Sequence, residues 1–255
     1  MWDYETNFDY LGVVAGESKT LLDRTCSKFP IPPKGLVLFF DRCNYQDYPE
    51  RSIWRNLGIH MNIEHGDNRN RKSPEPVEII IKSRNYAQLI WLSQRAWDAS
   101  QIDFVWNLSH ELRHFEQYVE NRAISLAYYF LKYCFCNFNV DIEEPKIHTV
   151  FPPEKDAELA AWRISRQVIN EPEVDSYVHN NANKGAKKEI FQDLLNYDPN
   201  KEYDVCNSTL LFLRKYKPQF ENCLNSGPDY YLRKIGSIDD LCSRLFIKSF
   251  DDSQS

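Results

Sequence analysis

The sequence predicts an α+β fold: a small, mostly antiparallel sheet packed on a long helix, followed by a mainly helical C-terminal part. Two runs with strand composition, 57–63 and 76–83, flank a polar segment that is typical of a hairpin loop. No glycine occurs inside 67–184, which favours long helices in the centre of the chain. The segment 186–250 then carries further helical patterns separated by turn sequences.

The predicted sheet comes from the first third of the chain. Residues 16–29 (GESKTLLDRTCSKF) have a helical pattern, and 31–42 (IPPKGLVLFFDR) indicate a turn that leads into a buried strand. The runs LGIHMNI (57–63) and PVEIIIKS (76–83) enclose the polar stretch 65–75, whose composition is that of an exposed loop. We expect these runs to pair as the antiparallel part of the sheet.

The glycine-free centre predicts three helices. The first spans about 85–97, and the second starts near Asp103 and runs into the 130s. A turn rich in acids and proline precedes the third helix, which runs from about Glu154 to Val168. Three more helical patterns follow, at 187–197, 208–224 and 237–250.

Composition and charge argue against several classes of protein. The 255 residues include 31 basic and 37 acidic ones, for a net charge of -6, and the short basic clusters at 69–72 and 184–188 are too small to bind nucleic acid or a membrane surface. The acidic N-terminus does not resemble a signal peptide, and the apolar segment 124–138 is too short to span a bilayer. Seven cysteines, an odd number, favour reduced thiols. We therefore expect a cytoplasmic protein with no nucleic-acid or membrane partner.

The stretch NLSHELRHFEQ (107–117) holds the order H-E-x-x-H inside the predicted second helix. At about 100° per residue, His110 and His114 lie one turn apart on one face, where both rings can bind one ion. Glu111 is turned away by about a quarter circle. Zinc enzymes use this spacing for two ligands and a base. Because the helix becomes apolar nearly all round after Ile124, we expect the histidine face to line a cleft.

A second group of acids lies in PPEKDAELAAWRIS (152–165). Glu154 and Glu158 follow the same helical stripe as apolar residues further along, whereas Asp156 lies off that stripe. Two prolines followed by acids are also an ordinary helix start. A carboxylate that faces a core nevertheless needs a strong partner, and a zinc ion or a metal-bound histidine is such a partner.

These two segments together resemble the zincin metallopeptidases of the gluzincin type. The matching residues are H-E-L-R-H at 110–114 and E-K-D-A-E at 154–158, with 39 residues between them. The resemblance covers roughly 57–168, and the run VEIIIKS matches the strand that lies along the cleft in such proteins. Arg113 departs from the family, which usually has an uncharged residue there.

The resemblance implies a zinc-dependent metallopeptidase that hydrolyses peptide bonds by metal-activated water. One Zn²⁺ per chain would be held by His110, His114 and Glu154, with Glu111 as the general base. Glu158 would brace a ligand histidine. Because Glu158 stands where the family more often has aspartate, the sequence leaves open which of the two glutamates is the third ligand.

The predicted domain organisation follows from the same resemblance. Residues 1–170 would form the zincin-like catalytic domain, and 171–255 a helical C-terminal extension packed on the same core as a single compact unit. Donors for the oxyanion are eligible in that C-terminal part because it could close over the site: His179, Tyr177, Tyr230 and Tyr231. His148 and His179 are further alternatives for the third ligand.

Two other classes of function stay open in the sequence. The chain could be a zincin-like metal-binding module that regulates or binds a partner without peptidase activity. It could also be a helical interaction protein in which the motif is accidental. For the peptidase, the partner is a peptide or protein substrate, and neither its sequence nor the oligomeric state is predicted.

Overall fold

The computed structural model describes residues 4–6, 17–30, 36–41, 58–62, 88–93, 96, 100–138, 151–183, 188–198 and 200–246. The chain divides into two compact units, and each unit is made from two segments of the sequence. The sheet unit consists of Met1–Arg113 and Ala160–Asn180, and the helical unit of His114–Leu159 and Asn181–Ser255. The predicted boundary after residue 170 stays a prediction.

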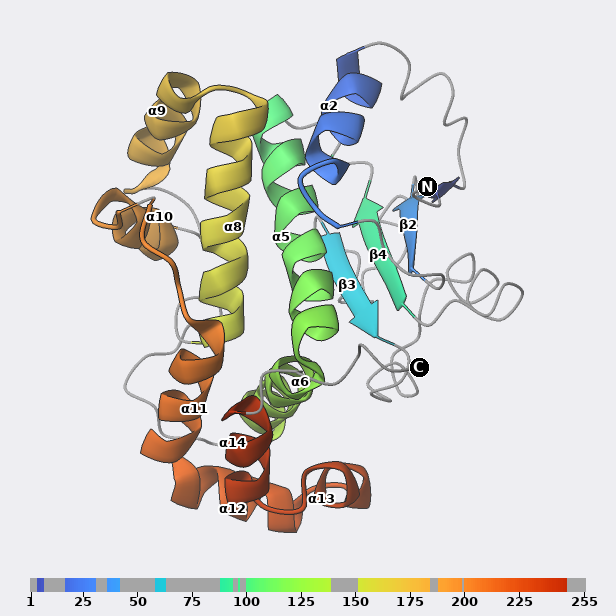
Figure 1. Ribbon diagram of the computed structural model, residues 1–255, viewed down its shortest axis with the longest axis vertical. Coiled ribbons are helices and arrows are strands. Elements are labelled where there is room, and N and C mark those ends of the chain that lie inside the picture. The colour runs from blue at the N-terminus through green and yellow to red at the C-terminus, as the bar shows by residue number, and fades with distance from the viewer. Residues whose placement is uncertain are drawn as a thin grey trace. The chain divides into compact units, whose positions relative to one another are not determined.

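The sheet unit contains a four-stranded sheet. Its strands are β1 (Tyr4–Thr6), β2 (Leu36–Asp41), β3 (Gly58–Asn62) and β4 (Gln88–Ser93), in the order β1-β2-β4-β3 (Figure 1). The pairs β1–β2 and β2–β4 are parallel, and β3 pairs antiparallel with β4, with His60 opposite Ile90. Among the described residues, β3 is therefore an edge strand and β4 an inner one.

The predicted fold class is wrong. The described residues are mostly helical, and two of the three strand pairs in the small sheet are parallel rather than antiparallel. Part of the error lies at 85–97, which was predicted as a helix but contains β4. All six residues of β4 are buried. An inner strand that is covered on both faces has no polar alternation, so its apolar run resembles a buried helix segment.

The remaining predicted strands have mixed outcomes. The runs at 31–42 and 57–63 contain β2 and β3, as predicted. The run at 76–83, predicted as the strand along the cleft, lies outside the described residues. Strand β1 carried no signal that the sequence analysis used.

Of the described helices, two belong to the sheet unit and two more continue from it into the other unit. The sheet unit contains α2 (Glu17–Cys26), α9 (Glu171–Asn181) and the first part of α5 (Gln101–Glu120). It also contains the second part of α8 (Pro152–Val168), close to the predicted third helix. Helix α9 was not predicted, although Asn170 caps it by accepting the N–H of Glu173 at 2.8 Å.

The predicted second helix is broken in two at Asn121. Helix α5 ends at Glu120 and α6 (Arg122–Asn137) begins immediately after. Asn121 has an extended backbone, and its side chain accepts the N–H of Ala123 at 2.9 Å. An asparagine that caps a new helix in this way ends the previous one, because its backbone leaves the helical region.

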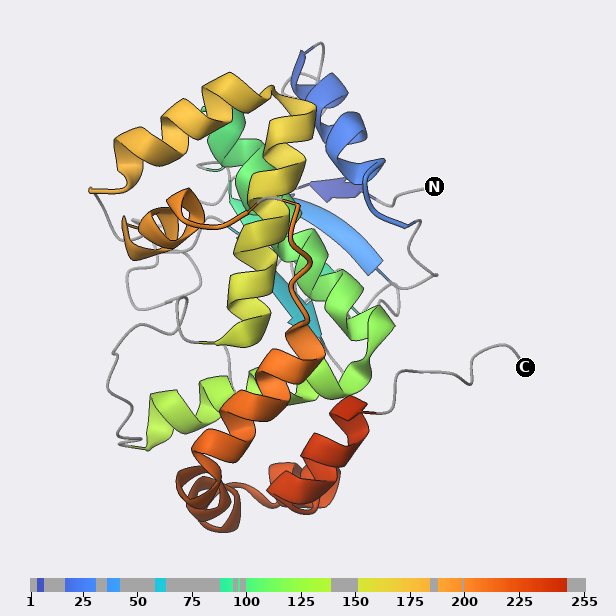
Figure 2. The same cartoon turned by 60° about the vertical axis from the view of Figure 1, so that its left-hand side comes forward.

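The helical unit is built around α6. Its other helices are α10 (Lys188–Leu195), α11 (Val205–Lys215), α12 (Lys217–Ser226), α13 (Asp229–Ile235) and α14 (Ile238–Phe246). The predicted helical pattern at 208–224 is divided between α11 and α12, since Pro218 lies in the first turn of α12. Helices α11 and α14 both contact α6 (Figure 2).

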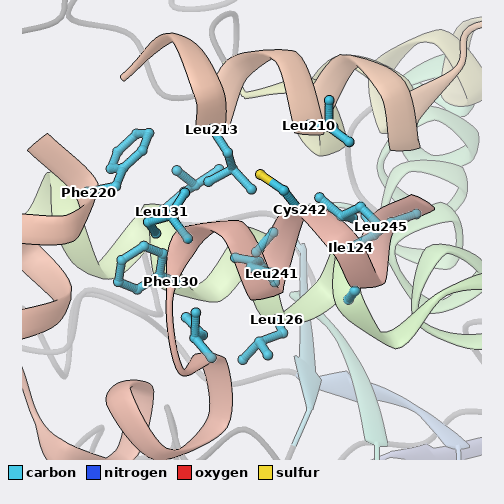
Figure 3. Packing of buried hydrophobic residues seen from close by; sticks show 14 of the residues in the cluster. Ile124, Leu126, Phe130, Leu131, Leu210, Leu213, Phe220, Leu241, Cys242 and Leu245 are labelled. Carbon is cyan, nitrogen blue, oxygen red and sulfur yellow. The ribbon is translucent and has the colours of Figure 1, made fainter. Parts of the chain in front are cut away.

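One apolar cluster forms the core of the helical unit. Figure 3 shows side chains of α6, α11, α12 and α14 that point toward one another. Fully buried members include Phe130, Leu131, Leu213, Phe220 and Leu241. Burial of these side chains is the main stabilising contribution in this unit.

The described helices contain no candidate membrane span. In that part of the chain none combines the length and the apolar character that crossing a bilayer requires.

Candidate metal centre

Helix α5 places the two motif histidines one turn apart in a buried position. His110 is 8% exposed and His114 is 5% exposed. The opposite stripe of α5 is buried as well, including Leu108, Leu112 and Phe115. Both faces of this helix are therefore covered, as expected for a helix whose histidines do not lie on open surface.

Helix α8 supplies three buried acids from its first two turns. Glu154 and Glu158 are each 2% exposed, which agrees with their position on the apolar stripe. Asp156 is also buried, at 5% exposed, although the stripe did not predict it. Buried carboxylates are costly unless they are paired, so each acid needs specific partners.

The two histidines and Glu154 come together as a group that could hold a metal ion. One ligand atom from each of His110, His114 and Glu154 lies within 4.8 Å of the others. His114 Nε2 and Glu154 Oε2 are 3.6 Å apart. Two ligands of one tetrahedral zinc ion, each about 2.1 Å from the metal, are about 3.4 Å apart. The spacing therefore fits an ion between these two atoms.

One side chain of α6, Tyr128, holds Glu154 and is itself held by Lys132 of the same helix. The Tyr128 hydroxyl donates to Glu154 Oε1 at 2.8 Å, and Lys132 Nζ donates to the Tyr128 oxygen at 3.1 Å. The Tyr128 ring also stacks on His114, with centroids 5.0 Å apart. The sequence analysis did not identify either residue, although a lysine inside the apolar segment 124–138 was a visible signal.

His114 is held through its other ring nitrogen. Its Nδ1 lies 3.0 Å from Gln117 Oε1. The Gln117 Nε2 group donates to the backbone oxygen of Pro153 at 2.8 Å and to Asp156 Oδ2 at 2.9 Å. The sequence analysis did not identify Gln117 as a partner of His114. The feature that indicates this contact is the position of Gln117 three residues after His114, on the same helix face.

The general-base candidate, Glu111, is tied to the edge strand of the sheet. Its Oε2 atom accepts the backbone N–H of His60 in β3 at 2.6 Å. The His60 ring in turn lies 2.8 Å, through Nε2, from Gln88 Oε1 in β4. A carboxylate has two oxygens, so this bond leaves Oε1 of the half-buried Glu111 for a second partner.

Glu158 lies at a pocket between α8 and α10. The pocket is lined by Lys155, Glu158, Leu159, Ile190, Asp193, Leu194 and Tyr197. At this pocket Lys155 Nζ pairs with Asp193 Oδ2 at 3.0 Å. Burial, together with the carboxylate of Asp156, raises the pKa of the nearby Tyr203 to about 12. The bracing role predicted for Glu158 stays a prediction.

The predicted oxyanion donors lie in several different places. Tyr177 donates to Asp103 near the start of α5, and its ring is 6.2 Å from that of Trp106. Tyr231 belongs to the apolar cluster and donates to the backbone oxygen of Tyr129 at 3.3 Å. Tyr230 packs against the same cluster, and His179 is exposed in the last turn of α9. The group of three ligand atoms forms without these residues, and His148 lies outside the described part of the chain.

Comparison with known proteins gives no relative. No family model, no curated protein and no solved structure matches the chain.

Proposed function

We propose that this chain is a zinc-dependent metallopeptidase. In this proposal His110, His114 and Glu154 hold one Zn²⁺, and Glu111 is the general base. The observation that carries it is the group of three buried ligand atoms within 4.8 Å of one another. Two imidazoles and one carboxylate are a usual protein ligand set for catalytic zinc.

The surroundings support Glu154, rather than Glu158, as the third ligand. Glu154 Oε2 lies 3.6 Å from His114 Nε2, while Tyr128 occupies the other carboxylate oxygen. A hydrogen bond to Oε1 favours binding of the metal through Oε2 alone. Glu158 instead lies one turn further along α8, at the wall of the pocket.

In this proposal Glu111 transfers the proton. When bound, zinc acts as a Lewis acid and lowers the pKa of water to about 7. Glu111 follows His110 directly in the chain, and its Oε2 is anchored by the His60 N–H. The remaining oxygen takes the proton of the attacking water and then gives it to the leaving amine.

A specific observation favours a peptide as the substrate. Glu111 contacts β3, which is an edge strand of the described sheet. An extended peptide binds such an edge by adding a strand through backbone hydrogen bonds. A peptide held along β3 would bring its backbone close to Glu111.

The second proposal is a metal-binding regulatory or partner-binding module without peptidase activity. The short bond of 2.6 Å between Glu111 and the His60 N–H favours it, because a carboxylate in that bond also serves as a structural link between α5 and β3. A hydroxamate distinguishes the two proposals: it binds a zinc ion that has an open coordination position, as in an enzyme, and does not bind a closed site.

The first test is metal analysis of the protein purified without added zinc, followed by a peptide-cleavage assay. We expect about one zinc per chain and new N-termini, identified by mass spectrometry, in a peptide mixture. Glu111→Gln should retain zinc and lower kcat by about 10²–10⁴-fold, because general-base catalysis contributes about that much.

Glu120→Gln is the matched control for this test. Glu120 is an exposed carboxylate at the end of the same helix, so its replacement should leave both zinc content and cleavage unchanged. Full activity in the Glu111→Gln protein contradicts the peptidase mechanism. Zinc without cleavage, together with no hydroxamate binding, supports the module instead.

A further inference from the structure

Gln117 stands at a junction between the two helices that supply the candidate ligands. It belongs to α5 and is 2% exposed. Its side chain contacts His114 on its own helix and both Pro153 and Asp156 in the first turns of α8. A single amide therefore touches one ligand histidine and the segment that begins with Pro153 and Glu154.

The contacts of Gln117 determine which way its amide points. The backbone oxygen of Pro153 and the carboxylate of Asp156 are both acceptors, at 2.8 and 2.9 Å. Reversing the amide would place its oxygen against these two oxygens, which is unfavourable. The NH₂ group therefore faces α8, and Oε1 faces His114.

The direction of the amide in turn determines the tautomer of His114. An amide oxygen only accepts, so the His114 Nδ1 atom, 3.0 Å away, must carry the hydrogen. The lone pair of a neutral ring is then on Nε2, which is the atom 3.6 Å from Glu154 Oε2. This is the nitrogen that a metal ion between the two residues requires.

We propose that Gln117 is a positioning residue: it fixes the tautomer and orientation of His114 and couples them to the start of α8, where Glu154 lies. The inference rests on the proposed metal centre, because it concerns how the ligands of that centre are held. Partners of this kind typically contribute 10- to 100-fold to metal affinity. Gln117 thereby orients the ligand His114 by a hydrogen bond, as Tyr128 orients the ligand Glu154.

The test uses two changes at Gln117. Gln117→Met keeps the length of the side chain and removes both polar groups, so zinc affinity should fall 10- to 100-fold in a competition titration with a chromophoric chelator. The double variant Gln117→Glu with Asp156→Asn exchanges amide and carboxylate without changing the net charge. It keeps an acceptor for His114 Nδ1 and a hydrogen bond with residue 156, but it loses the donor to the Pro153 oxygen, so zinc affinity should recover only part of the loss seen in Gln117→Met.

Gln88→Met provides the matched control. Gln88 is also buried and also contacts a histidine, His60, but that histidine is not part of the metal group. We expect unchanged zinc affinity in this variant. The visible spectrum of bound Co²⁺ should change in Gln117→Met and not in Gln88→Met, which separates ligand positioning from a general loss of stability.

A metal-free readout separates this inference from the proposed function. Long-range ¹H–¹⁵N spectra of the metal-free wild type, at a pH where the ring is neutral, should show the Nδ1–H tautomer of His114, and Gln117→Met should lose it. If wild type shows that tautomer but binds no zinc, the proposed function fails while the positioning by Gln117 is supported. If wild type binds zinc and Gln117→Met binds it equally well, or the double variant is no better than Gln117→Met, the positioning role is overturned.

Discussion

The two buried regions of the helical unit are held together by different interactions, although α6 belongs to both. One side of α6 joins the apolar cluster through Phe130 and Leu131, whose partners are aliphatic and aromatic. On another side, the Tyr128 hydroxyl donates to Glu154, and Lys132 donates to the Tyr128 oxygen. The same helix therefore contributes hydrophobic stabilisation in one direction and polar contacts in the other.

The two regions differ in the free energy of burying their side chains. The apolar cluster gains free energy from removing its side chains from water and needs no particular hydrogen bonds. The region around His114 buries Glu154, Asp156 and Gln117, each in defined polar contacts. Such a network contributes little net stability, so its presence beside a good apolar core supports the proposed metal centre.

The strongest way to test this contrast is to remove the charge of one glutamate. Glu154→Gln keeps the shape of the side chain but removes a ligand charge, so zinc affinity should fall by more than about a hundredfold, beyond the loss of an outer partner. The free energy of unfolding of the metal-free protein should change by only about 1 kcal/mol. Glu158→Gln is the matched control. Loss of zinc in Glu158→Gln but not in Glu154→Gln would identify Glu158 as the third ligand.

The opposite result is expected in the apolar cluster. Phe130 is fully buried, with its ring 5.6 Å from that of Tyr231 and 6.3 Å from that of Phe220. Phe130→Ala should lower the free energy of unfolding by about 3–5 kcal/mol, because it removes buried area and leaves a cavity. Denaturant unfolding of the metal-free protein measures this. Phe130→Leu should cost less, and equal costs for the two variants would contradict close packing at this position.

The smallest and sharpest comparison uses one hydroxyl from each region. Tyr128→Phe removes the donor to Glu154 Oε1 and should weaken zinc binding about tenfold. Tyr231→Phe removes the bond to the Tyr129 backbone oxygen and should lower the free energy of unfolding by about 1 kcal/mol, with zinc affinity unchanged. If both variants affected zinc affinity equally, the two regions would not be functionally distinct.

The sequence predicted those features that depend on local spacing. One turn of helix is enough to bring His110 and His114 to one face, and the 3- and 4-residue steps in α8 were enough to predict that Glu154 and Glu158 face inward. The helix boundaries at Asn121 and Pro218 also have local sequence signals, although the predicted helices ran across both positions. Each is a residue whose local chemistry ends or begins a helix.

Other features depend on residues far apart in the chain, so only the tertiary structure decided them. Strand β4 was predicted as a helix because it is an inner strand with all six residues buried, so its sequence has no polar alternation. The contacts of Glu111 with His60 and of Glu154 with Tyr128 join segments 51 and 26 residues apart. Local periodicity cannot specify such pairs, because they form only when separate elements pack together. The sequence alone therefore supplied the candidate ligands and left Glu154 and Glu158 as alternatives, whereas packing decided that Glu154 groups with the two histidines and which partners orient them.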